Sequence, residues 1–163
     1  MILGTDSPDI INAGDGADTI CGQGGDDIIN GGQGSDEIFG GAGDDIINGG
    51  GGRDFIYGNG GDDFVSGGRG VDFIIGGAGD DDLRGNEGRD LLDGGAGDDE
   101  LRGGQRADSL LGGNGNDTLI GGIRNDFLYG GSGLDTYNGS GGTDNCILDN
   151  DGRTEQTINC ERR

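Results

Sequence analysis

The feature that most limits how this chain can fold is a nine-residue period that runs from Gly4 to Ile147 without an insertion or a deletion. Sixteen consecutive units make up this stretch, and each unit has glycine, aspartate and an apolar residue at matching places. A short fixed period over most of a chain is typical of a solenoid, in which each unit packs on its neighbours instead of around one central core. We therefore expect an elongated stack of similar coils.

The sixth position of every unit is an aspartate. A preference of aspartate for turns does not explain this, because turns accept asparagine and serine as well. Carboxylate and carbonyl oxygens are the ligands that Ca²⁺ prefers. We therefore assign the aspartates as candidate metal ligands, which are Asp9, Asp18, Asp27, Asp36, Asp45, Asp54, Asp63, Asp72, Asp81, Asp90, Asp99, Asp108, Asp117, Asp126, Asp135 and Asp144.

Position eight is apolar in every unit, from Ile11 to Cys146, and we expect it to point inward from a short strand. Glycine dominates positions one and four, which suits a turn with positive φ and close backbone carbonyls. We expect the first six residues of each unit to form the turn and the last three to form the strand. Arg106 and Arg124 replace glycine at position four, so we expect weaker metal binding at these two turns.

Alternate units differ, which predicts a coil of two units and about eight coils in all. Position five of the odd-numbered units is mostly acidic, whereas it is mostly small or basic in the even-numbered units. The acidic residues are Asp26, Asp44, Asp62, Asp80 and Asp98. They are either further metal ligands or solvated surface charges.

The charge balance excludes several partners. The chain has 32 acidic and 10 basic residues, no histidine, and a formal net charge of −22. Nucleic acids and anionic membranes would be repelled, so we expect neither as a partner. No apolar run is long enough to cross a bilayer, and the first residues do not resemble a signal peptide. Because 29% apolar residues give little burial to offset this repulsion, we expect the chain to need bound cations in order to fold.

The pattern G-G-x-G-x-D-x-U-x, where U is a large apolar residue, resembles the repeats-in-toxin (RTX) or hemolysin-type calcium-binding repeat over residues 4 to 147. The resemblance implies an all-β fold, a right-handed parallel β-roll with two nonapeptides per coil. It also implies that each ion lies between one unit and the unit one coil further on, so that sixteen turns offer at most fourteen sites. We expect the roll to span residues 1–147 and a short C-terminal cap to span residues 148–163.

The expected function is that of a calcium-binding structural or interaction module, secreted or at the cell surface. The alternative is an extracellular recognition or adhesion module that binds a carbohydrate or another surface. An enzyme is disfavoured because the chain lacks histidine and lysine and has no insertion that could build a pocket.

The outward positions of the even-numbered units are unusually apolar. This face could contact a second copy, a neighbouring domain or a carbohydrate, or its side chains could simply pack on one another across strands. The residues concerned are Phe55, Tyr57, Phe73, Ile75, Phe127 and Tyr129. Cys146 in the last repeat and Cys160 beyond the repeats either form a disulfide that pins the cap, which we favour, or remain free thiols.

Overall fold

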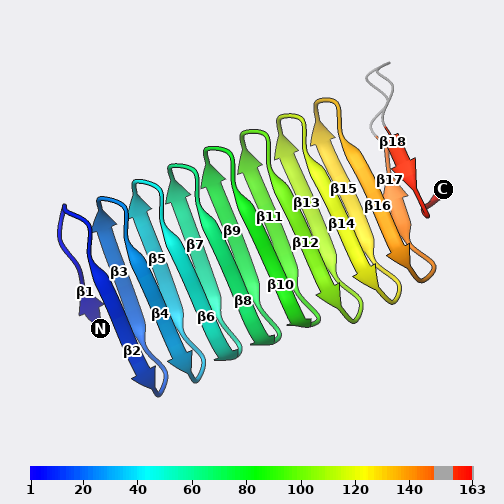
Figure 1. Cartoon of the computed structure of the whole chain (residues 1–163). Coiled ribbons are helices and arrows are strands. Elements are labelled where there is room, and N and C mark those ends of the chain that lie inside the picture. The colour runs from blue at the N-terminus through cyan, green and yellow to red at the C-terminus, as the bar shows by residue number, and fades with distance from the viewer. Residues whose placement is uncertain (149–155, 163) are drawn as a thin grey trace.

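The structure, a computed structural model, describes residues 1–148 and 156–162, and these residues form two parallel β-sheets without a helix. The chain alternates between the sheets, and each coil stacks on the previous one along a single long axis (Figure 1). The predicted all-β parallel β-roll of about eight coils is confirmed. With no helix among the described residues, none could cross a membrane.

We name the two sheets by their outward side chains. The ten-stranded aromatic sheet consists of β1 (Ile2–Leu3), β3 (Thr19–Gly24), β5 (Glu37–Ala42), β7 (Phe55–Gly60), β9 (Phe73–Ala78), β11 (Leu91–Ala96), β13 (Ser109–Asn114), β15 (Phe127–Ser132), β17 (Asn145–Ile147) and β19 (Glu161–Arg162). The nine-stranded asparagine sheet consists of β2 (Ile10–Asp15), β4 (Ile28–Gln33), β6 (Ile46–Gly52), β8 (Phe64–Gly70), β10 (Asp82–Gly88), β12 (Glu100–Gln105), β14 (Thr118–Ile123), β16 (Thr136–Gly141) and β18 (Gln156–Ile158).

Within the repeats each residue pairs with the residue 18 positions further on, so that equivalent side chains form straight rows along the axis. Ile11 lies opposite Ile29, and Ile29 lies opposite Ile47. The predicted coil of two units is therefore confirmed by the strand register.

The strands are longer than we predicted. Most of them have six or seven residues, because the ladder continues from position seven through position three of the next unit. For example, Gly14 still pairs with Gly32 and Asp15 with Gln33. The expectation of six-residue turns and three-residue strands is thus wrong, since positions two and three of the next unit still pair with their equivalents one coil away. Only positions four to six form the turn.

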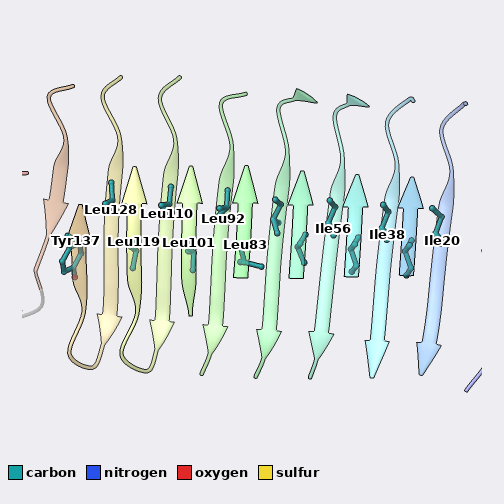
Figure 2. Packing of buried hydrophobic residues seen from close by; sticks show 14 of the residues in the cluster. Ile20, Ile38, Ile56, Leu83, Leu92, Leu101, Leu110, Leu119, Leu128 and Tyr137 are labelled. Atoms are coloured by element: carbon teal, nitrogen blue, oxygen red, sulfur yellow. The ribbon is translucent and has the colours of Figure 1, made fainter. Parts of the chain in front are cut away.

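A single file of position-eight side chains fills the space between the sheets (Figure 2). These residues are almost fully buried, as alternation along a strand requires. The file runs through Ile11, Ile20, Ile29, Ile38, Ile47, Ile56, Val65, Ile74, Leu83, Leu92, Leu101, Leu110, Leu119, Leu128, Tyr137 and Cys146.

The outward residues of the aromatic sheet pack on one another across strands. The rings of Phe39 and Tyr57 stack with centroids 5.0 Å apart, and those of Phe55 and Phe73 lie 6.0 Å apart. Phe55 is 37% exposed and Tyr129 39% exposed. Cross-strand packing therefore accounts for the stacked rings, and docking on this face stays a prediction.

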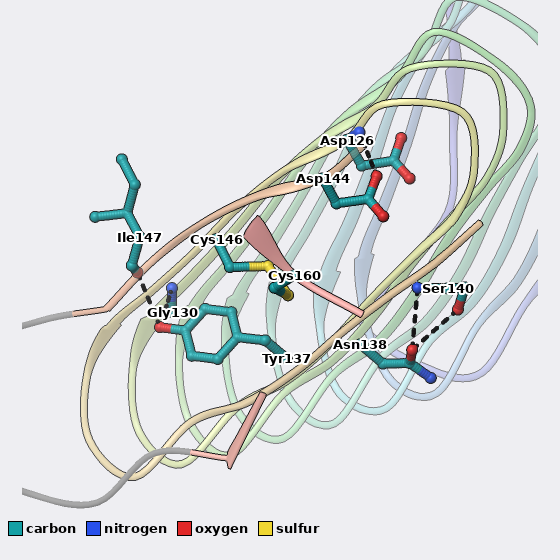
Figure 3. The surroundings of a disulfide bond; sticks show 9 residues. All are labelled: Asp126, Gly130, Tyr137, Asn138, Ser140, Asp144, Cys146, Ile147 and Cys160. Carbon is teal, nitrogen blue, oxygen red and sulfur yellow. Dashed lines mark hydrogen bonds between the residues drawn. A yellow bond between two sulfur atoms is a disulfide. The ribbon is translucent and has the colours of Figure 1, made fainter. Parts of the chain in front are cut away.

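The C-terminal end of the roll is closed by a disulfide between Cys146 and Cys160, which confirms the favoured pairing (Figure 3). Tyr137 fills the core beside it, where its hydroxyl accepts a hydrogen bond from the Gly130 N–H and donates one to the Ile147 carbonyl. Strands β18 and β19 extend the two sheets by pairing with β16 and β17. Part of the predicted cap, residues 149–155 and 163, lies outside the described residues.

Candidate metal sites in the stacked turns

The turns form two rows along opposite sides of the roll, the upper and lower sides in Figure 1. Turns of the odd-numbered units lead from the aromatic to the asparagine sheet, and we call their row the aspartate edge because it carries Asp26, Asp44, Asp62, Asp80 and Asp98. Turns of the even-numbered units lead back, and we call their row the arginine edge because it carries Arg53, Arg69, Arg89, Arg106 and Arg124. The sixteen candidate ligands are divided equally between these edges.

Each position-six aspartate is held by a contact with the next coil. The backbone N–H of Asp27 donates to Asp45 Oδ1 over 2.8 Å, and the same bond joins Asp126 to Asp144 over 2.9 Å (Figure 3). The bond recurs on both edges at every step from Asp9 to Asp126. One carboxylate oxygen of each following aspartate is thereby fixed, and the orientation of the other follows from it.

The second oxygen, Oδ2, is buried and has no hydrogen-bond donor among the described residues at most of these positions. The position-six aspartates from Asp27 onward are at most 2% exposed. A buried carboxylate oxygen without a donor is costly unless a cation or a proton compensates it. The atoms concerned belong to Asp27, Asp36, Asp45, Asp54, Asp63, Asp72, Asp81, Asp90, Asp99, Asp108, Asp117, Asp126 and Asp144.

The two aspartates nearest the N-terminus differ from the rest. Asp9 and Asp18 are only partly buried, because fewer coils cover them. The Oδ2 atom of Asp9 accepts hydrogen bonds from the backbone N–H and the hydroxyl of Thr5. The structure therefore places fourteen of the sixteen candidates in the buried rows and Asp9 and Asp18 at their start.

The position-one glycine brings carbonyl oxygens close to these carboxylates. A Cβ atom added to Gly31 would lie 2.6 Å from both Asp36 Oδ2 and the carbonyl oxygen of Gly49, and Gly103 has the same surroundings. Gly31 and Gly103 do not have positive φ, so this position needs glycine for space and not for conformation. The sequence analysis expected glycine here both for positive φ and for close backbone carbonyls, and only the need for space holds at position one.

Positive φ occurs at positions two and four of the units. A Cβ on Gly34 would collide with the carbonyl oxygen of Gly16 one coil earlier, so position four requires glycine for space as well. Arg106 and Arg124 nevertheless occupy position four with φ of 78° and 95°. Such a conformation is strained for a residue with a side chain.

The pKa values show how unfavourable the buried carboxylates are without compensation. Burial, followed by the charges of neighbouring aspartates, raises the pKa of Asp63 and of Asp81 from 3.8 to about 7. The hydrogen bond from the preceding coil lowers these pKa values but does not offset the burial. The pKa of Asp108 on the arginine edge is also raised to about 7, so carboxylates on both edges favour a proton or a nearby cation close to neutral pH.

The acidic residues at position five are exposed and stabilise the backbone. Asp62 Oδ1 accepts a hydrogen bond from the N–H of Asp80, and Asp80 Oδ1 accepts one from the N–H of Asp98, at 2.8 and 2.7 Å. Asn116 continues the row beyond Asp98. These side chains cap the next turn, a role that our sequence analysis did not foresee.

Carboxylates alone do not form a metal site here. No group of three acidic, cysteine or histidine side chains among the described residues lies close enough to hold an ion. A metal ion here would therefore have fewer than three of these side chains as ligands and would take its other oxygen ligands from elsewhere, such as the backbone carbonyls of the turns. Ca²⁺ accepts such a mixed set of six to eight oxygen ligands, so the residues present fit it.

Comparison with known proteins agrees with this geometry. The family model of the RTX calcium-binding nonapeptide repeat matches residues 3–38, 22–56, 39–74, 75–110 and 111–146, which together cover most of the chain. No curated protein matches. Residues 3–146 contain all sixteen position-six aspartates and both rows of turns. The chain therefore belongs to the RTX calcium-binding nonapeptide repeat family.

Proposed function

We propose that the chain is a structural and interaction module that folds when Ca²⁺ ions bind between successive turns on both edges. The observation that carries this proposal is the set of thirteen buried Oδ2 atoms, named above, that have no hydrogen-bond donor among the described residues. Each ion is shared by position-six aspartates 18 residues apart and by carbonyl oxygens of their glycine turns. With eight turns on each edge, seven gaps per edge give up to fourteen sites.

The charge of the chain explains why binding and folding are coupled. Fourteen divalent ions would change a net charge of −22 into a small positive charge. Without them, closing the coils brings buried aspartates of successive turns next to each other, as the raised pKa values of Asp63 and Asp81 indicate. Binding free energy therefore contributes directly to the free energy of folding.

The proposal also includes the setting and the limits of the module. We infer a secreted or cell-surface location, because free Ca²⁺ is abundant there and the Cys146–Cys160 disulfide is stable in an oxidising compartment. We infer that residues 1–147 form the roll and that residues 148–163 act as its cap.

The test is a calcium titration followed by far-ultraviolet circular dichroism at pH 7. We expect a disordered spectrum in chelator, a cooperative change to β-structure with Ca²⁺, and reversal by chelator. A spectrum that is equally β-rich after complete removal of metal would overturn the proposal. Magnesium at the same concentration is the control, and we expect much weaker induction because Mg²⁺ demands stricter geometry and keeps its waters.

Two adjacent residues provide a matched pair of variants. Asp81→Asn removes a buried charge at position six, whereas Asp80→Asn keeps the exposed acceptor that the next turn uses. We expect Asp81→Asn to shift the calcium midpoint to clearly higher concentration and Asp80→Asn to shift it little. Equal shifts would contradict the assignment of position six as the ligand.

A further inference from the structure

Five arginines form a regular row on the arginine edge. Arg53, Arg69, Arg89, Arg106 and Arg124 occupy five consecutive coils, one in each, and all five side chains are exposed. Only one ion pair joins a member of this row to a described acidic residue, the contact of Arg69 with Glu87 at 3.9 Å, and both of its side chains are well exposed. The row therefore presents positive charge to the solvent once per coil.

The surface between these arginines is hollowed. A depression of about 540 Å³ lies between Arg106 and Arg124, and another of about 430 Å³ is lined by Arg69, Arg89 and Arg106. Arg106 lines both depressions, so together they form a shallow furrow that follows the edge over four coils. A furrow of this kind can accept a narrow ridge with charges along its crest.

The opposite side of the same molecule has such a ridge. Asp26, Asp44, Asp62, Asp80 and Asp98 occupy five consecutive coils and are exposed at the outermost part of their turns. Hydrogen bonds from the next coil to Asp26, Asp44, Asp62 and Asp80 hold these side chains in one orientation. The carboxylates are consequently pre-organised, which lowers the entropic cost of pairing them.

The two rows match in spacing because they belong to one solenoid. The aspartates follow one another every 18 residues and the arginines every 16 to 20 residues, so each row has one member per coil of about 4.8 Å along the axis. Counted from the N-terminus, the aspartates occupy coils two to six and the arginines occupy coils three to seven. A second copy displaced sideways without rotation, and shifted by about one coil, therefore brings all five arginines opposite five aspartates.

We propose that the aspartate edge of one molecule docks along the arginine edge of a second copy, so that parallel rolls associate side by side. The interface is heterologous and leaves one edge of each kind unused, so it continues into open rows and does not close into a dimer. Charge complementarity at a common spacing favours a second copy as the partner. A single exposed ion pair contributes little, but five in register act together.

The experiment uses exchanged charges at matched positions of the calcium-loaded chain. Arg53 and Arg89 stand at position five of their units, as Asp44 and Asp80 do, so each residue type is already accepted at this position. The variant D44R/D80R replaces two of the five aspartates of the aspartate edge with arginine, and R53D/R89D replaces two of the five arginines of the arginine edge with aspartate. Sedimentation at low ionic strength measures association, and circular dichroism checks that each variant folds with calcium.

We expect the unaltered chain to self-associate in a concentration-dependent manner and to dissociate as salt is added. Each double variant alone should associate ~10-fold more weakly or less, because like charges then face each other. An equimolar mixture of the two variants should regain association. The quadruple variant D44R/D80R/R53D/R89D keeps the net charge of the original chain but puts like charges opposite each other in four of the five pairs, so it should associate as weakly as the double variants or more weakly.

Three results would overturn the proposal. The unaltered chain could remain monomeric at all concentrations, the double variants could associate as strongly as the original, or the folded mixture could fail to associate. Association that survives the exchanges would place the contact on another surface, such as the aromatic sheet. D82N/R84Q, which removes an ion pair from the asparagine sheet without changing the net charge, is the control and should leave association unchanged.

Discussion

The two edges of the roll share a buried frame, which consists of the position-six aspartates and the position-one glycines. Their exposed turn residues carry opposite charge. On both, an aspartate at position six receives the N–H of the preceding coil and a position-one glycine leaves room for its second oxygen. Outside this frame one edge presents aspartates and the other presents arginines. The comparison teaches that the same buried aspartates and glycines occur beneath different outer turn residues, so the outer residues can vary while this frame is kept.

The outer residues nevertheless act on the frame through their charge. The charges of Asp44 and Asp62 contribute to raising the pKa of Asp63 on the aspartate edge. On the arginine edge, Arg89 works in the opposite direction on Asp108. A stronger negative field attracts Ca²⁺ more strongly, so we expect the aspartate edge to hold its ions more tightly.

The largest predicted effect is common to both edges and concerns the position-one glycine. Gly49→Ala on the arginine edge and Gly58→Ala on the aspartate edge each drive a methyl group into an Asp Oδ2 and a carbonyl oxygen of the next coil. We expect each to abolish calcium-induced β-structure or to raise the calcium midpoint at least ~10-fold, since overpacking costs about 1–3 kcal/mol or more. Circular dichroism during a calcium titration measures this.

The control is Gly60→Ala, because a Cβ on Gly60 has no atom within 4 Å and its φ is not positive. We expect this variant to behave like the original chain within about 0.5 kcal/mol. If Gly58→Ala were tolerated while Gly49→Ala was not, the buried frame would differ between the two edges, which would contradict our view.

The second prediction concerns pH in the absence of calcium. The folded roll holds Asp54 with a pKa of about 6 and Asp117 with one of about 7, whereas the ordinary value is 3.8. Between pH 3.8 and about 7 the folded state therefore binds more protons than the unfolded state, and stability falls as pH rises. In chelator we expect β-structure to increase when the pH is lowered from 7 to 5.

Calcium should reverse this dependence, because protons then compete with the ion for the same carboxylates. Titrations at pH 5 and pH 7 should show a lower calcium affinity at pH 5. Asp117→Asn, which carries no charge at either pH, should weaken the pH effect measured in chelator. A metal-free spectrum that does not change between pH 7 and pH 5 would contradict the burial of charged carboxylates on both edges.

The smallest predicted effect is specific to the arginine edge, where two arginines replace the position-four glycine. Arg106→Gly and Arg124→Gly should each stabilise the calcium-loaded roll by about 1 kcal/mol, because glycine adopts positive φ without strain. Thermal unfolding with excess calcium measures the change. Arg89→Gly, at a position without positive φ, is the matched control and should be neutral or slightly destabilising. Destabilisation by Arg106→Gly would mean that this arginine supports its turn.

The sequence predicted the parts of the fold that depend on periodicity. The inward file from Ile11 to Cys146 and the 18-residue register follow directly from the regular spacing. Strand length could not be predicted in this way, because glycine is a poor strand former and only the neighbouring coils keep Gly14 and Gly32 in the ladder.

The candidate ligands could likewise be located but not characterised. Their repetition identified the aspartates, whereas the donor-free Oδ2 atoms and the crowding at Gly31 appear only once successive coils are stacked. The capping role of Asp62 and Asp80 was hidden for the same reason, since their partners lie 18 residues away. The contacts between successive coils could thus not be predicted, because the pattern of a single unit does not contain them.

The direction of the sheet ladders has a mechanical consequence. Hydrogen bonds between successive coils run roughly along the long axis, so tension applied to the two termini loads the coils one after another. Each coil that detaches releases 18 residues, or about 60 Å of extended chain. A roll built in this way should therefore lengthen in equal steps under load.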